Sequence, residues 1–259
     1  MKQPLAYIHP AAKIASSVVI DPFVTIDANV EIGEGTRILS GATILEGSRI
    51  GKNVTIFPNA VIGAIPQDLK FVGEETLAVI GDNTVLRECG TGNRGTAARG
   101  KTVVGSNCLI MAYSHVAHDC VVGDNVIISN STQLAGEVVV DNFAVIGGGT
   151  LVHQFCHLGA HVMIQGGALI NKDIPPFVKA AREPIAYTGV NSVGLRRRGF
   201  TSEQIREIQE VYRYIYMSNL NVSDAVERVE AELPATKERD EILQFIRNAK
   251  RGIIRGYFN

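Results

Sequence analysis

The sequence of 259 residues has no tryptophan, few aromatic residues (6%) and almost no net charge. With 25 Lys and Arg against 26 Asp and Glu, the formal charge of -1 provides no overall field that would attract a nucleic acid. No apolar run approaches the roughly 18 residues that a membrane-spanning helix needs. The N-terminal segment also has no apolar stretch of the length found in secretory signals. We therefore expect a cytoplasmic protein with no membrane span and no nucleic-acid partner.

Cysteine is scarce as well. The four cysteines, Cys89, Cys108, Cys120 and Cys156, match no zinc-binding spacing, and we expect them to be reduced and to pack as small hydrophobes. Without large aromatic anchors, the core must be filled by small and aliphatic side chains. This composition disfavours a conventional sandwich or helical bundle.

The sequence is instead rich in a repeat of six residues. Isoleucine occupies every sixth position from Ile8 to Ile62, and aliphatic residues resume the same phase at Ile80 and continue to Ile170. Six is a multiple of the strand period of two and fits the helix period of 3.6 poorly, so the repeat predicts very short strands separated by turns. Small or branched residues recur four positions after each aliphatic residue and are expected to point inward too.

Glycine and asparagine recur between the predicted strands, where tight corners favour positive φ angles. These residues are Gly33, Gly51, Asn53, Gly63, Gly81, Asn83, Gly105, Asn107, Gly123 and Asn125. A coil of short sides that stacks on itself at about 4.8 Å forms a parallel β-helix. The hexapeptide pattern resembles that of the left-handed β-helix acyltransferases, and this resemblance implies left-handed coils of three sides and 18 residues.

The hexad pattern divides the chain into two predicted domains. It fails at Asp68 and Glu74 and again at Gly92 and Ala98, which predicts loops near 63–79 and 90–103 that leave the β-helix. It ends before two prolines, so we assign residues 1–174 to the β-helix and 175–259 to a C-terminal α-helical domain. A capping box at Thr201 predicts a helix to about residue 218, and further helices are expected near 223–232 and 237–250.

Residues 18 apart should lie in one column of the β-helix, about one strand spacing apart. His115 and His153 fall near the edge that carries His118, and Asp119 follows His118 directly. Histidine suits proton transfer near neutral pH, and an adjacent carboxylate orients it. One column is formed by His118, Gly136 and Gln154. The spacing therefore predicts His118 as a base and Asp119 as its orienting group, with room for a ligand at the glycine.

Two other interpretations of these histidines stay open at this point. His115, His118 and His153 could bind zinc, as histidines from neighbouring subunits do in the β-helical carbonic anhydrases. The column with Gly136 and Gln154 offers no further metal ligand, so we predict no metal site. The histidines could also decorate the surface of a non-catalytic scaffold.

Several segments resemble, in the same order, the family of UDP-N-acetylglucosamine O-acyltransferases that use acyl carrier protein. The matching residues are 67–70 (QDLK), 115–120 (HVAHDC), 147–148 (GG), 152–156 (VHQFC), 159–163 (GAHVM), 194–195 (GL) and 197–200 (RRGF). The resemblance implies transfer of an R-3-hydroxyacyl chain to the sugar 3-hydroxyl, the first step of lipid A biosynthesis. It also implies a homotrimer with inter-subunit active sites and no bound cofactor, because the acyl donor arrives on the phosphopantetheine of acyl carrier protein.

The resemblance assigns roles to individual residues. His118 is the expected general base, Asp119 holds it, and the N–H of Gly136 stabilises the oxyanion, a contact worth roughly 3 to 4 kcal/mol. Residues expected to contact the sugar nucleotide or shape the acyl pocket are Asp68, Lys70, His115 and His153. Residues expected at the nucleotide and phosphate end are Gln154, Asn191, Arg197 and Arg198. Gly166 matches the floor of the acyl groove and predicts a long acyl chain, although it could be only a corner of the coil.

The chain departs from the family pattern at two positions. Glu137 stands where a histidine often follows the oxyanion glycine, and Val193 stands where an acidic residue is common. The exact acyl-chain length and the acceptance of a 3-amino sugar stay open. Carrier-protein docking is expected on a basic surface that includes Lys179, Arg182, Arg206 or Arg213. The alternative functions are the N-acyltransferase of the same pathway, an acetyl-CoA-dependent sugar acetyltransferase, and the non-catalytic scaffold.

Overall fold

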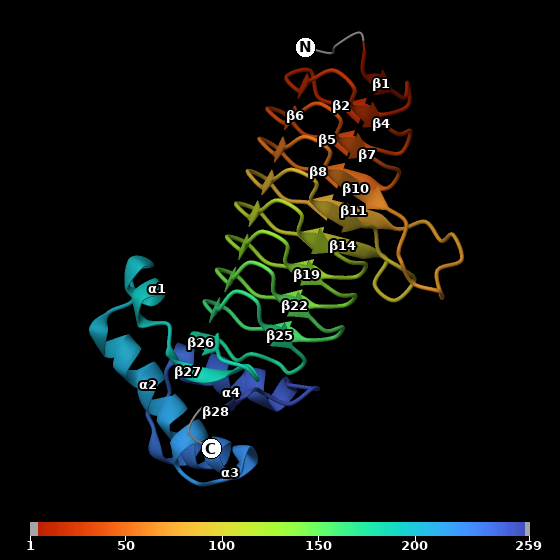
Figure 1. Cartoon of the computed structure of the whole chain (residues 1–259). Helices are drawn as coiled ribbons and strands as arrows, with labels where there is room; N and C mark the ends of the chain where they lie inside the picture. Colours follow the sequence, from red (N-terminus) through yellow and green to blue (C-terminus); the bar gives the residue numbers. More distant parts are fainter. Residues whose placement is uncertain (1–4, 257–259) are drawn as a thin grey trace.

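The computed structural model describes residues 5–256 and shows a long three-sided β-helix that leads into a helical region (Figure 1). The coils contribute one strand each to three sheets, in which strands of successive coils pair in parallel, except that the last coil adds only an isolated bridge to the second sheet. After the coils end, β27 (Ala186–Val190) pairs antiparallel with β26 (Val178–Ala181). Ile8 lies opposite Ile26, and Ile26 lies opposite Ile44, which gives the expected 18 residues per coil. The hexad repeat therefore determines the register of the sheets.

Within residues 5–256 the three sheets contain nine, eight and eleven strands. The first sheet comprises β1 (Tyr7–Ile8), β4 (Thr25–Ile26), β7 (Thr43–Ile44), β10 (Val61–Ala64), β13 (Thr91–Asn93), β16 (His115–Val116), β19 (Gln133–Leu134), β22 (Leu151–Val152) and β25 (Leu169–Ile170). The second comprises β2 (Lys13–Ile14), β5 (Glu31–Ile32), β8 (Ser48–Ile50), β11 (Leu77–Ile80), β14 (Lys101–Val104), β17 (Val121–Val122), β20 (Val139–Val140) and β23 (His157–Leu158). The third comprises β3 (Val19–Ile20), β6 (Arg37–Ile38), β9 (Thr55–Ile56), β12 (Val85–Leu86), β15 (Leu109–Ile110), β18 (Ile127–Ile128), β21 (Val145–Ile146), β24 (Met163–Ile164), β26 (Val178–Ala181), β27 (Ala186–Val190) and β28 (Arg255–Gly256).

Three corners connect these sheets, and we number them by the chain direction. The first corner joins the first sheet to the second, the second corner joins the second to the third, and the third corner returns to the first sheet. This numbering is used below because the candidate site residues divide among the corners.

The core is a continuous column of hexad aliphatics with smaller side chains at the corners. Ile26, Ile44 and Ile62 are completely buried. The residues four positions later are buried as well, and their polar members donate hydrogen bonds to main-chain carbonyls. Thr84 Oγ1 donates to the carbonyl of Gly105 (2.7 Å), and Cys120 Sγ donates to that of Ala135 (3.1 Å). Buried polar groups in this narrow core are therefore satisfied within the repeat.

The cysteines fit this pattern only in part. Cys108, Cys120 and Cys156 are reduced and buried, as the sequence predicts. Burial raises the pKa of the Cys120 thiol to about 12, so this thiol stays protonated and inert. Cys89 is only half-buried and has a positive φ of 55°, so it is a corner residue instead of a core residue.

The recurring glycines serve a different purpose from the one that we predicted. Asn53, Asn83, Asn107 and Asn125 have positive φ angles, as does Gly63. The prediction of positive φ is wrong for the glycines that begin the same corners, namely Gly33, Gly51, Gly81, Gly105 and Gly123. A Cβ on Gly81 would lie 2.5 Å from the carbonyl carbon of Gly105 in the next coil. These glycines are needed because the coils approach too closely for a side chain.

Two loops leave the β-helix at the first corner, and they protrude on the same side (Figure 1). They span 65–76, between β10 and β11, and 94–100, between β13 and β14. Both are shorter than the predicted 63–79 and 90–103, because the flanking strands are longer than two residues. Gly92, expected in the second loop, stays in β13 and lies opposite Ile62 and Val116.

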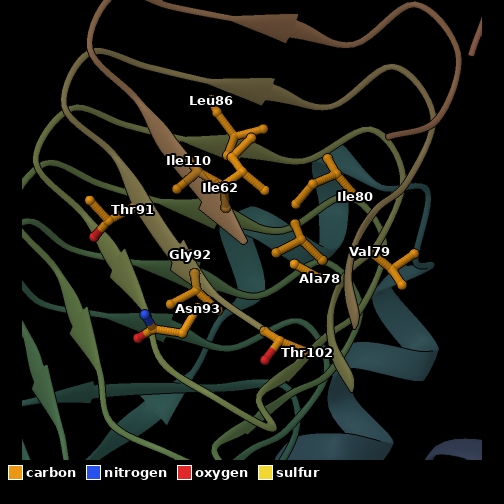
Figure 2. Close-up of a pocket in the computed structure, with 12 residues that line it drawn as sticks. Ile62, Ala78, Val79, Ile80, Leu86, Thr91, Gly92, Asn93, Thr102 and Ile110 are labelled. Carbon is orange, nitrogen blue, oxygen red and sulfur yellow. The ribbon is translucent and has the colours of Figure 1, made fainter. Parts of the chain in front are cut away.

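The β-helix has a small cavity where the hexad pattern weakens. The cavity has a volume of about 10 Å³ and is lined by Ile62, Ala78, Leu86 and Gly92, among others (Figure 2). Gly92 occupies a position that an aliphatic residue fills in the intact hexads. Outside residues 91–93, no described atom lies within 4 Å of a Cβ built on Gly92. The cavity is therefore space left by an absent side chain.

The C-terminal region contains α1 (Ser192–Arg197), α2 (Ser202–Met217), α3 (Val222–Glu232) and α4 (Lys237–Asn248). Thr201 and Gln204 form the predicted capping box of α2. The hexads end near residue 174, but the third sheet continues through β26, β27 and β28, so residues 175–256 are not wholly helical. The outer limits of the two predicted domains, residues 1 and 259, lie outside the described residues.

The helical region is fixed to the β-helix through its tyrosines. Tyr212 is fully buried and donates a hydrogen bond to the carbonyl of Pro176. The ring of Tyr187 in β27 stacks on that of Tyr216 with centroids 4.4 Å apart.

No helix among residues 5–256 combines the length and the apolarity required to cross a membrane.

We predict that Gly92→Ala stabilises the protein by about 1 kcal/mol, because the methyl group enters open space and reduces the entropy of the unfolded chain. Denaturant unfolding measures this change. Gly167→Ala is the matched control, since its Cβ also meets no atom but its φ is 71°, and it should destabilise. Easier unfolding of Gly92→Ala than of the unchanged protein would contradict this account of the cavity.

Candidate active site

His118 and Asp119 form a buried pair at the first corner, between β16 and β17. His118 Nδ1 lies 2.9 Å from Oδ2 of Asp119, and the His118 side chain is only 9% exposed. Asp119 has a φ of 59°, the same corner conformation as Glu137 in the next coil. Because the carboxylate holds Nδ1, the proton resides there and Nε2 is the nitrogen that can accept another.

The Asp119 carboxylate is completely buried and fully hydrogen-bonded. Besides the bond with His118, it accepts bonds from Thr96 N (3.0 Å), Thr96 Oγ1 (2.6 Å) and Arg99 N (3.2 Å), all in loop 94–100. Burial acts to raise the pKa of this carboxyl, but the bonds from Thr96 and His118 outweigh burial and lower the pKa below its usual value. Asp119 is therefore a fixed anion beside the imidazole.

Gly136 lies directly against the His118 ring in the neighbouring coil. A Cβ on Gly136 would stand 2.5 Å from His118 Nε2, so no other residue fits there without moving the imidazole. The N–H of Glu137 donates to the His118 carbonyl, which fixes the two coils in register. Within residues 5–256 the N–H of Gly136 donates to no protein acceptor. The predicted column thus places a free backbone donor beside the candidate base.

Loop 65–76 brings a second carboxylate to the same imidazole. Asp68 Oδ2 lies 3.8 Å from His118 Nε2, and Asp68 Oδ1 accepts the N–H of Lys70, whose side chain is exposed. His115 Nδ1 lies 2.7 Å from Oγ1 of Thr91 in β13. Burial, with a smaller contribution from His118, lowers the pKa of His115 and favours its neutral form. Of the two histidines, His118 is therefore the one whose ring nitrogens face carboxylates, whereas His115 faces a hydroxyl.

His153 and Gln154 also belong to the first corner, one coil beyond Gly136. His153 is exposed, and its Nδ1 lies 3.0 Å from the carbonyl oxygen of Gln154. The N–H of Phe155 donates to the carbonyl of Gly136, which continues the predicted column. The residues that the structure gathers at this corner are Asp68, Lys70, His115, His118, Asp119, Gly136, His153 and Gln154.

Asn191, Arg197 and Arg198 lie at the second corner, away from this group. Asn191 is buried and caps α1: its Oδ1 accepts Gly194 N, and its Nδ2 donates to the His161 carbonyl. Arg197 is exposed, whereas the Arg198 guanidinium lies 5.3 Å from the Phe143 ring centroid. Burial lowers the pKa of Arg198, and its buried Nη1 has no partner within the described part of the chain. This unpaired donor can bind an anion such as phosphate.

Gly166 lies at the third corner, between β24 and β25, and is exposed. A Cβ on Gly166 would approach the carbonyl oxygen of Gly148 to 3.0 Å.

Of the two departures from the family pattern, Glu137 is half-buried at the first corner, and Val193 is 58% exposed in α1. The site residues predicted from the sequence therefore divide among all three corners of one chain.

Sequence reasoning missed three residues that shape these groups. Thr96 binds Asp119, Thr91 binds His115, and the His161 ring lies between Phe143 and Phe177 with centroids at 4.8 and 5.6 Å. The hexad break at 92 and 98 was the only signal for the first two residues. Among residues 5–256, no group of three or more His, Cys, Asp and Glu side chains is arranged to hold a metal ion.

Three family models match the chain. Residues 173–254 match the second domain of UDP-N-acetylglucosamine O-acyltransferase, residues 101–136 match the bacterial transferase hexapeptide repeat, and residues 2–96 match the GMPPB C-terminal domain. Together they agree with the predicted left-handed β-helix followed by a helical C-terminal region.

Similar proteins match over nearly the whole chain. The acyl-[acyl-carrier-protein]–UDP-N-acetylglucosamine O-acyltransferase of Halorhodospira halophila is 46% identical over 97% of this chain and 98% of its own. The solved UDP-N-acetylglucosamine acyltransferase of Bacteroides fragilis is 59% identical, with a TM-score of 0.97 over 98% of this chain and 100% of its own. That of Francisella novicida is 40% identical, with a TM-score of 0.96 over 99% and 95%.

We predict that His161 makes the protein sensitive to acid. Burial, with smaller contributions from Arg198 and Lys237, lowers its pKa from 6.5 to about 4. Between these pH values the unfolded chain binds a proton that the folded protein does not, so stability falls as the pH falls from 6.5 to 4. His161→Phe should flatten the plot of unfolding free energy against pH in this range. Phe245→Leu, which removes a buried ring that packs on His157 and leaves the surroundings of His161 unchanged, should leave the slope in place. An equal slope in His161→Phe would contradict the assignment.

Proposed function

The chain belongs to the family of acyl-[acyl-carrier-protein]–UDP-N-acetylglucosamine O-acyltransferases, and we propose that His118 is the general base of its reaction. It is an enzyme that transfers an acyl chain from acyl carrier protein to UDP-N-acetylglucosamine. We further propose an R-3-hydroxyacyl chain as the group transferred, the sugar 3-hydroxyl as its acceptor, and the first step of lipid A biosynthesis as its place. The cytoplasmic location expected from the sequence stays a prediction.

The observation that carries the proposal is the buried imidazole between two carboxylates. His118 Nε2 removes the proton of the sugar hydroxyl, and the hydroxyl oxygen attacks the carbonyl carbon of the thioester. The Asp119 carboxylate, 2.9 Å from Nδ1, stabilises the imidazolium that forms. The tetrahedral intermediate then collapses, the carbon–sulfur bond breaks, and the imidazolium returns its proton to the departing thiolate of the phosphopantetheine.

Gly136 supports the same step from the neighbouring coil. Its N–H has no protein acceptor among the described residues and stands beside the His118 ring. A free N–H that is rigidly held by a sheet stabilises an oxyanion without reorganisation, and such a donor is worth roughly 3 to 4 kcal/mol. Asp68, 3.8 Å from Nε2, is the group that we assign to orienting the sugar hydroxyl.

The division of the site among three corners supports a trimer. The base lies at the first corner, the phosphate-end arginines at the second, and Gly166, the proposed floor of the acyl groove, at the third. One β-helix holds these corners on different edges, so a substrate that contacts all three groups must bridge subunits. The proposed site therefore lies between neighbouring chains, with His153 and Gln154 at the seam.

The outward-facing strand residues give independent support. In the first coils most of these residues are polar or charged, such as Lys13, Glu31 and Arg37, although Tyr7 and Val19 are apolar and exposed. From β11 to β21 the outward residues directly before the hexad aliphatics of the second and third sheets are all apolar, and His157 in β23 ends this run in the second sheet. The apolar residues are Val79, Val103, Val121, Val139, Val85, Leu109, Ile127 and Val145. A closed ring of three chains needs two different complementary surfaces on each chain, and these two faces supply them.

We predict that His118→Ala lowers kcat by about 100-fold to 10,000-fold, the usual contribution of a general base. Single-turnover transfer from hydroxyacyl carrier protein to UDP-N-acetylglucosamine, with the product identified by mass, measures this loss. His9→Ala in the first coil should keep full activity. Undiminished turnover in a folded His118→Ala variant would overturn the proposed base.

We predict that Ile127→Glu converts the protein to monomers and removes its activity, because a charge in an apolar interface is left unpaired. Light scattering coupled to size exclusion gives the mass. Thr55→Glu lies on an outward position of the same sheet in an earlier coil and should leave the oligomer intact. An active monomer of Ile127→Glu would exclude the shared site.

A further inference from the structure

Loop 94–100 closes over Asp119 and is the part of the molecule whose role the proposed reaction leaves open. Thr96 uses two donors on the carboxylate: its N–H reaches Oδ1 at 3.0 Å and its hydroxyl reaches Oδ2 at 2.6 Å. Oδ2 is also the oxygen that holds His118 Nδ1. One carboxylate oxygen is therefore shared between the imidazole and a single hydroxyl.

The Thr96 hydroxyl is itself held in one orientation. It is buried, and its oxygen accepts the N–H of Ala98 at 3.1 Å, so its own proton is free to point only at Asp119. Arg99 N completes the shell on Oδ1. Four donors from three residues leave the carboxylate no freedom to rotate away from His118.

The loop is in turn tied to the other loop at this corner. Thr76 Oγ1 donates to the carbonyl of Gly95 at 2.6 Å, and the N–H of Ala97 donates to Glu74 Oε1 at 2.9 Å. Buried Asn93 donates through Nδ2 to the carbonyl of Ile65 at 2.9 Å. These contacts join Thr96 to the segment that carries Asp68, so both carboxylates at His118 are set by one assembly of loops.

We infer that Thr96 is a positioning residue of the acyl transfer, which holds Asp119 in the orientation that aligns the His118 imidazole for proton removal. This inference rests on His118 being the general base. The bond runs across 23 positions of sequence and requires the excursion at the first corner, which explains why the hexad pattern is interrupted there. Among the described residues the Thr96 hydroxyl donates only to Asp119, so we assign it to holding this carboxylate.

The test is Thr96→Val, which keeps the size of the side chain and the backbone N–H but removes the hydroxyl. A hydrogen bond to a charged group of this kind corresponds to roughly a tenfold to hundredfold change, so kcat should fall by that factor while the KM for UDP-N-acetylglucosamine stays the same. Thr96→Ser restores the donor and should return kcat to within a few-fold of the unchanged enzyme.

A pH profile separates positioning from a purely structural role. Without the hydroxyl, Asp119 binds a proton more readily and attracts the imidazolium more strongly, so the acid limb of kcat/KM should move to higher pH. The other charged groups around the pair are Asp68 and Glu74 on loop 65–76, His115 on β16, and Arg99, and none of them is changed. Titration of the His118 ring protons by NMR should show the same upward shift.

Thr84→Val is the matched control, because Thr84 is a fully buried threonine that donates to a carbonyl at a different corner. It should lower thermal stability without moving the acid limb. Suppose that His118→Ala is inactive but Thr96→Val keeps its kcat and the acid limb of its kcat/KM profile. This result would overturn the role of Thr96 and leave that of His118 standing. Full activity of His118→Ala would overturn both assignments. If Thr96→Val does not fold, Thr96→Ala is measured by the same two readouts.

Discussion

The stacking of coils at 18-residue intervals is the constraint on which the rest of the molecule depends. It aligns the hexad aliphatics into one buried column and brings successive corners so close that Gly33, Gly81 and Gly105 admit no side chain. The same closeness puts Gly136 against the His118 ring. A catalytic group on a flexible loop would need further packing to fix it, whereas here the pairing of two coils fixes the imidazole and the backbone N–H together. The scaffold thus preorganises the site through its own hydrogen bonds.

The regular repeat supplies the proposed base, His118, and its neighbour Asp119, and the departures from the repeat complete their surroundings. Gly92 leaves a cavity of about 10 Å³ in the column, and its chain neighbours Thr91 and Asn93 turn their polar side chains to His115 and to loop 65–76. A larger aliphatic residue at 92 would continue the hexads. The weakened packing at this coil accompanies longer strands and a register shift between β10 and β13, and both loops leave here at the first corner.

The sequence predicts the repeated part of the molecule well because a period of six has only one simple structural solution. Strands, inward residues, the alignment of His118 with Gly136 and the capping box at Thr201 all follow from spacing over a few residues or one coil. The bond between Thr96 and Asp119 does not, because it depends on the path of an irregular loop. Nor do β26 to β28, because they pair after the hexads end and no hexad specifies their register. Asn191 illustrates a third limit: its amide is committed to capping α1 and to His161, which a family pattern does not reveal.

The same geometry explains why the proposed base, His118, lies at a corner of the coils and not inside the β-helix. A β-helix of this width has a core only one aliphatic residue thick on each side, so it cannot enclose a substrate. Its binding surfaces must lie on edges, and each edge presents one type of group: the imidazole and carboxylates, the guanidinium of Arg198, or the open glycine at 166. In the proposed trimer another chain completes the enclosure, and the apolar outward residues of the later coils are the surface that we assign to this contact.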